Sequence, residues 1–186
     1  MRLKLFFLFF ILSSSLFGQS DYTNFVKIKK LFIEEKYSDV LKSDIDFKKS
    51  SEFYPYLLFY KSVAEYRLNS KEKALDSFQN IVKIFSNWSQ LNEVYYWLVR
   101  INSEKNNLDD ALIYFSKVSN FSILDELYPI IDPIIGNISS FNRLSEFYKL
   151  YPKNKSVAKY YGRFLLREYL NKDVINEINE ILKIVD

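Results

Sequence analysis

Apolar residues recur every three or four positions over most of this chain, which is the period of an amphipathic helix. Two clear series flank Asn69 and Ser70, and they comprise Leu57, Leu58, Ala64 and Leu68, then Ala74, Leu75, Phe78, Ile81, Val82 and Phe85. This pattern predicts two helices joined by a short polar turn. Asparagine tolerates the left-handed backbone conformation that ends many helices, so we expect it at Asn69 and, one unit later, at Asn106.

A small residue recurs at one position of what reads as a single helical hairpin repeated five times. The five positions, at spacings of 34, 37, 29 and 34 residues, are Val40, Ala74, Ala111, Ser140 and Val174. A hairpin of two short helices cannot bury its own apolar face, so copies must stack side by side. The expected fold is therefore all-α, a right-handed α-solenoid of about five hairpins over residues 21–186, with units near 21–54, 55–91, 92–120, 121–154 and 155–186. The alternative is an ordinary all-α bundle with one closed core.

Three of these units share a pattern of residues with a known repeat. Counted from Asn92, the third unit has Tyr95, Leu98, Ala111, Phe115 and Val118 at positions 4, 7, 20, 24 and 27. The second unit supplies Leu58, Ser62, Ala74, Phe78 and Ile81, and the fifth supplies Gly162, Val174, Ile178 and Ile181. The chain thus resembles tetratricopeptide repeat proteins, whose consensus has apolar and small residues at these positions.

The longest spacing between units, 37 residues, makes the resemblance more specific. Its three additional residues fall in the turn at residues 85–89. The chain is similar in this respect to the exported repeats of bacterial outer-membrane-assembly and Tol-associated periplasmic proteins. That resemblance implies an adaptor or scaffold that binds a protein or peptide partner in the cell envelope.

The pattern weakens in the fourth unit, where Pro129 and Pro133 would each remove a helical hydrogen bond and clash with the preceding turn. We predict a kink or break between Pro129 and Gly136, so that no continuous helix runs through Pro133. Asp132 could instead cap a new short helix that starts at Pro133, with Gly136 permitting the exit.

The first twenty residues differ from the rest of the chain. Arg2 and Lys4 precede an unbroken apolar run over residues 5–12, which is followed by serines and a glycine. This order predicts a secretory signal peptide over residues 1–18, with cleavage as late as residue 20. The run is shorter than the about 20 residues that span a bilayer, so we expect no integral membrane segment after cleavage; a retained anchor is the alternative. The predicted location is the periplasm of a Gram-negative bacterium, or the medium after secretion.

Composition argues against most catalytic chemistry. The chain has no histidine and no cysteine, which excludes Ser-His and Cys-His nucleophiles. We therefore predict no enzymatic activity, no cofactor and no metal, although a hydrolase built on a Ser-Lys or carboxylate pair is a remaining hypothesis. Lys and Arg total 26 against 23 Asp and Glu, which gives little attraction for nucleic acid. Oligomeric state stays open.

The resemblance also indicates where a partner would bind, because the first helix of each tetratricopeptide unit lines an inner groove. The positions that face this groove hold Phe59, Tyr66, Arg67, Tyr96, Arg100, Lys159, Arg163 and Arg167. Aromatic and Arg side chains are the usual anchors of protein interfaces. Two alternatives remain: these aromatics pack between repeats beside solvated cations, or they bind carbohydrate or peptidoglycan.

Overall fold

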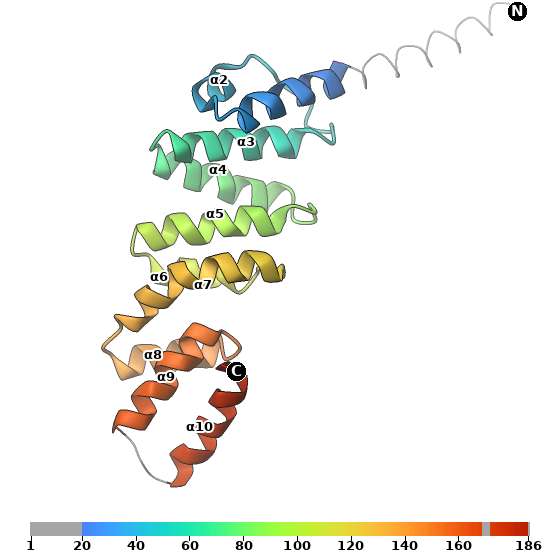
Figure 1. Ribbon diagram of the computed structural model, residues 1–186. Helices are drawn as coiled ribbons and strands as arrows, with labels where there is room; N and C mark the ends of the chain where they lie inside the picture. Colours follow the sequence, from blue (N-terminus) through green and yellow to red (C-terminus); the bar gives the residue numbers. More distant parts are fainter. Residues whose placement is uncertain (1–19, 169–171, 186) are drawn as a thin grey trace, which may run out of the picture. The chain divides into compact units, whose positions relative to one another are not determined.

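The computed structural model describes residues 20–168 and 172–185, and within those ranges it is helical with no β-strand (Figure 1). The all-α prediction is therefore confirmed. The predicted signal peptide over residues 1–18 lies outside the described residues. The chain divides into two compact units, one up to Trp88 and the other from Ser89 onward.

The first unit contains a helix over the described residues 20–33, followed by α2 (Tyr37–Lys42), α3 (Tyr54–Arg67) and α4 (Lys71–Ile84). Helix α3 packs against both α2 and α4. Aromatic rings join residues 20–33 to the following segments: Phe25 stacks on Phe53 at 4.7 Å and Phe32 stacks on Tyr60 at 4.6 Å between ring centroids. Such pairs add specific geometry to the burial of apolar area.

The second unit contains α5 (Leu91–Glu104), α6 (Leu108–Phe115), α7 (Phe121–Gly136), α8 (Phe141–Leu150), α9 (Lys155–Glu168) and α10 (Lys172–Val185). Helices α5, α7 and α9 contact one another in succession, while α6 and α8 pack beside them (Figure 1). One apolar core includes residues from α6 to α10, with Leu112, Leu127, Ile131, Ile135 and Leu144 among its most buried members.

Three helix ends use the same turn. Asn69 and Asn106 have positive φ angles of 63° and 57°, which confirms the prediction for both, and Glu35 has the third, at 55°. After Asn69, the Ser70 amide donates to the Glu65 carbonyl at 2.8 Å, and the residues around Asn106 and Glu35 repeat this bond. This is the Schellman motif. The turn at Glu35 was not predicted, because glutamate carries no preference for this conformation.

The prediction of a small buried residue at one shared position of each unit is correct in part. Val40, Ala74 and Ala111 are fully buried, and each lies four residues after the residue that precedes its helix. Ser140 does not occupy this position, contrary to the prediction. It is exposed and caps α8, since its side chain accepts a hydrogen bond from the Arg143 amide at 3.4 Å. The buried residue four positions later is Leu144. Val174 is half-buried.

The predicted interruption of the fourth unit is wrong, because α7 is one continuous helix with Pro129 and Pro133 inside it. Both prolines are exposed. The opposite face buries Ile123, Leu127, Ile131 and Ile135, spaced four residues apart. Burial of a large aliphatic side chain is worth about 1.5–3 kcal/mol, so this face outweighs the cost of the prolines. The start of helix α7 is capped by Asn120, whose side chain accepts a hydrogen bond from the Ile123 amide at 3.3 Å.

Candidate functional site

The predicted partner-binding residues of the first unit lie along α3. The Phe59 ring is half-buried and makes edge contacts with Tyr60, Phe78 and Trp88 at 6.0–6.1 Å between ring centroids. This placement agrees with the alternative that the aromatic side chain is a packing residue. Near the end of the helix, Tyr66 is half-buried and Arg67 is exposed.

Tyr96 and Arg100 lie one turn apart on α5 and contact each other directly. The Arg100 guanidinium donates from Nη1 to the Tyr96 hydroxyl at 3.1 Å and from Nε to Glu104 Oε1 at 3.3 Å. The Tyr96 ring meets Trp97 edge-on at 5.4 Å. These contacts hold the guanidinium along the helix surface.

Three cations lie four residues apart on α9 and therefore share one face of the helix: Lys159, Arg163 and Arg167. The Arg163 guanidinium lies 5.4 Å from the centroid of the Tyr160 ring, and that of Arg167 lies 5.4 Å from the Phe164 ring. Both arginines are exposed. Among the predicted partner-binding residues, those on α9 bring together three cations beside two aromatic rings.

Asp132 joins this face of α9 to α7. Its carboxylate accepts hydrogen bonds from Lys159 Nζ at 2.8 Å, from the Tyr160 hydroxyl at 2.9 Å and from Ser156 Oγ at 2.9 Å. Burial tends to raise the pKa of Asp132, but these three donors together hold that pKa below its ordinary value. Asp132 therefore does not cap a helix, as the sequence suggested; it fixes Lys159 and Tyr160 in place.

We expect Asp132 to make the second unit sensitive to acid. The folded state binds the Asp132 proton less tightly than the unfolded chain does, so the carboxylate stabilises the fold above about pH 4 and loses that effect as the pH falls through the lowered folded-state pKa. Urea denaturation at a series of pH values compares the wild type with Asp132→Asn. The difference in unfolding free energy should hold steady near neutral pH and shrink below about pH 4.

The exposed Asp125 on the same helix supplies the control, because Asp125→Asn removes an equal charge without these hydrogen bonds. A difference for Asp132→Asn that is as large in acid as at neutral pH would contradict the assignment.

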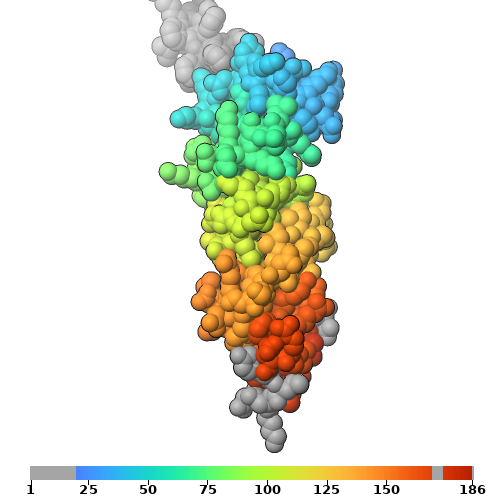
Figure 2. Space-filling model, turned by 90° about the vertical axis from the view of Figure 1, so that its left-hand side faces the viewer, coloured from blue at the N-terminus to red at the C-terminus, as the bar shows by residue number. Residues whose placement is uncertain are grey.

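A hollow of about 200 Å³ lies beside the cations of α9. It is lined by Gly136, Ile138, Leu144, Tyr160, Arg163, Phe164 and Arg167. Figure 2 shows the orange to orange-red surfaces of α7, α8 and α9 lying against one another in this unit. A Cβ atom at Gly136 would come within 2.7 Å of Tyr160 Cζ, so a larger residue would require the Tyr160 ring to shift. Gly136 is also the last residue of α7, so the helix exit lies where the sequence placed it.

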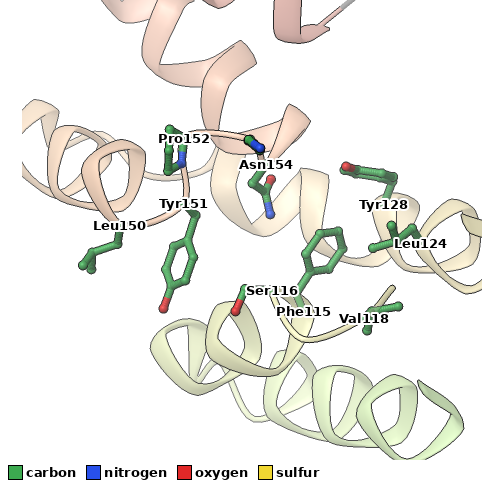
Figure 3. A pocket seen from close by; sticks show the side chains of 10 residues that line it. Phe115, Ser116, Val118, Leu124, Tyr128, Leu150, Tyr151, Pro152 and Asn154 are labelled. Atoms are coloured by element: carbon green, nitrogen blue, oxygen red, sulfur yellow. The ribbon is translucent and has the colours of Figure 1, made fainter. Parts of the chain in front are cut away.

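A larger pocket, of about 350 Å³, lies where the sequence predicted no site. The end of α6, the start of α7 and the connection from α8 to α9 enclose it (Figure 3). Helix α6 has 8 residues whereas α4 has 14, and this early end leaves the space open. The sequence does contain a sign of this early helix end, because the apolar helical series stops at Phe115 and is followed by the polar residues Ser116 and Lys117.

Neither a metal cluster nor a membrane-spanning helix is found among the described residues. Residues 20–168 and 172–185 contain no cluster of three acidic, histidine or cysteine side chains that could hold a metal. Within the same ranges, no helix combines the length and the apolar character needed to cross a bilayer.

Comparison with known proteins adds no relative: no protein-family model, no curated protein and no solved structure matches this chain. The cationic and aromatic face of α9 therefore stands on its geometry alone.

Proposed function

We propose that this chain is a non-enzymatic, exported adaptor of the tetratricopeptide kind, which binds a protein or peptide partner in the periplasm of a Gram-negative bacterium. The observation that carries the proposal is the exposed face of α9, where Lys159, Arg163 and Arg167 lie beside the rings of Tyr160 and Phe164. Arginine and aromatic side chains together supply the contact area and the directional hydrogen bonds that anchor protein interfaces.

The proposed right-handed α-solenoid rests on two regularities. The turns at Glu35, Asn69 and Asn106 have one hydrogen-bond pattern and are separated by 34 and 37 residues, which are also the spacings of Val40, Ala74 and Ala111. In the second unit, α5, α7 and α9 contact one another in order. Both are expected when each hairpin depends on its neighbours for burial.

The chemistry of the α9 face suggests what the partner presents. The Asp132 carboxylate already pairs with Lys159, and Glu168 pairs with Arg167 through Nε at 2.6 Å. Arg163 and Arg167 are nevertheless exposed at the hollow they share with Phe164. A guanidinium stacked on a ring keeps its edge donors directed outward, where they pair best with carboxylates. We therefore expect an acidic partner segment that also carries an apolar or aromatic side chain to enter the hollow.

A charge reversal tests this surface. The purified protein is immobilised and exposed to envelope extract, and a partner recovered in stoichiometric amount is then titrated against Arg163→Glu. We expect at least about a tenfold loss of affinity, because the substitution replaces the attraction between Arg163 and an acidic partner residue with repulsion between two carboxylates. Substitution of Tyr96 or Arg100 should weaken the same complex by a smaller factor.

Lys149→Glu is the matched control, since Lys149 is an exposed cation of α8 that does not line the hollow. It makes the same change in charge and should leave the affinity within about twofold. Equal binding by the wild type and Arg163→Glu would show that the surface is wrong. Recovery of no partner from any extract would count against the adaptor itself.

The alternative function is binding of carbohydrate or peptidoglycan, which the half-buried rings of Tyr160 and Phe164 favour, because sugars stack on aromatic faces. Sedimentation with purified cell wall separates the two functions. A protein adaptor stays in the supernatant, whereas a wall-binding module sediments and is released by soluble wall fragments.

A further inference from the structure

The pocket at the end of α6 contains a buried polar side chain that points into it. Asn154 is only 7% exposed and precedes α9. Its side-chain oxygen accepts a hydrogen bond from the Val157 amide at 3.1 Å, which identifies the other end of the side chain as the nitrogen. That nitrogen has no hydrogen-bond partner among the described residues, and it points into the pocket (Figure 3). Its N–H donors are therefore available to a molecule in the pocket, so a ligand that supplies an acceptor can bind there.

The other polar groups of the pocket also favour an anion or a hydrogen-bond acceptor. Lys153 is the one charged side chain in its lining, which contains no Asp or Glu. The 14-residue helix α9 begins at this point, so its first backbone N–H groups add positive potential. Burial raises the pKa of both Tyr128 and Tyr151, aided at Tyr151 by the charge of Asp109, so both hydroxyls remain protonated near neutral pH.

The remaining wall is apolar. Phe115, Val118 and Leu124 line one side, and the Asn154 side chain enters from the connection between α8 and α9 (Figure 3). The Phe115 ring meets Tyr128 edge-on at 5.2 Å, which closes that side of the pocket. A volume of about 350 Å³ accommodates one ring or a short branched chain together with a carboxylate.

We propose that this pocket binds an apolar organic acid, with its hydrocarbon part against Phe115, Val118 and Leu124 and its carboxylate at the Asn154 amide. This inference does not depend on the adaptor function, because none of the cations on α9 that carry that function lines the pocket. The same chemistry is presented by a free aryl or alkyl acid and by the carboxyl-terminal residue of a peptide.

Isothermal titration calorimetry with the purified protein tests the proposal using 3-phenylpropionate and its primary amide as probes. The acid should bind at least about tenfold more tightly than the amide, because only the carboxylate gains charge-assisted hydrogen bonds. N-acetylphenylalanine and short peptides ending in phenylalanine form the second arm. If these bind more tightly than 3-phenylpropionate, the natural source is a peptide end; if they bind equally or more weakly, it is a small acid.

Asn154→Asp is the decisive variant. Aspartate caps a helix as well as asparagine does, so α9 keeps its start while the pocket gains a carboxylate in place of its donors. Affinity for the acid should fall at least about tenfold while the thermal denaturation midpoint stays close to that of the wild type. Ser140→Asp adds the same charge at the cap of α8, away from the pocket, and should leave binding unchanged.

A second variant protects the test against a folding defect at Asn154. Ser116 is exposed at the rim, and Ser116→Trp should fill the pocket and abolish binding of every probe. The proposal fails if 3-phenylpropionate does not bind at millimolar concentration, if acid and amide bind equally, or if Asn154→Asp binds the acid as the wild type does.

Discussion

Phe147→Ala is expected to lower the unfolding free energy of the second unit by about 3–5 kcal/mol. Phe147 lies on α8, is only 4% exposed and belongs to the large apolar core of that unit. The Arg143 guanidinium also lies 5.4 Å from its ring centroid, so the substitution removes a cation–π contact as well. Because protein interiors are close-packed, neighbouring side chains cannot fully occupy the volume that the ring vacates. Urea denaturation followed by far-ultraviolet circular dichroism measures the loss.

The chain contains a matched control for this substitution. Phe121, the first residue of α7, is 82% exposed. Phe121→Ala removes the same atoms from a position where water already surrounds them, so we expect a change within about 0.5 kcal/mol. Similar losses at the two positions would contradict the core described for this unit.

Ile131→Ala should cost about 2–5 kcal/mol, and the reason is specific to α7. Ile131 is fully buried, and in the sequence it lies between the exposed residues Pro129 and Pro133. The continuity of α7 depends on the burial of its apolar face. Removing this side chain weakens the burial that offsets the two prolines, so α7 should also lose helicity locally. Hydrogen exchange of the α7 amides should accelerate together with the drop in denaturation midpoint.

Ile113→Ala on α6 is the corresponding control, because Ile113 is 41% exposed. It should change stability much less and leave the exchange rates of α7 unaltered. Equal effects on exchange would mean that burial of Ile131 does not maintain the helix.

The local ends of helices were predictable where one residue type determines the backbone. Asn69 and Asn106 were identified because asparagine tolerates positive φ. Glu35 was missed, although it has the same turn, because its own side chain gives no sign of it. The repeat spacing could have found it, since Glu35 lies 34 residues before Asn69.

The fourth unit shows the limit of reasoning from single residues. Ser140 was chosen for its small size, yet position in the helix decides which side chain is buried, and that side chain is Leu144. The prolines of α7 predicted an interruption because their cost is local and easily recognised. The compensating burial depends on contacts with other helices, which the sequence does not display.

The candidate sites were predictable to different extents. The three cations of α9 share a face simply because they are four residues apart. Their environment was not predictable, because Asp132 precedes Lys159 by 27 residues and contacts it only through packing of α7 on α9. Likewise, no local pattern marks Asn154 as a buried donor.

The amino-acid sequence by itself determined that this protein is helical, that two of its helices end in turns at Asn69 and Asn106, and which side chains of α9 lie together. These properties depend on periods of a few residues and on intrinsic backbone preferences. Tertiary structure alone decided that α7 remains continuous, that Gly136 admits the Tyr160 ring, and that the short α6 leaves a pocket. Each of these depends on the volume and polarity of side chains brought together from distant segments, and the period of a single helix carries no information about them.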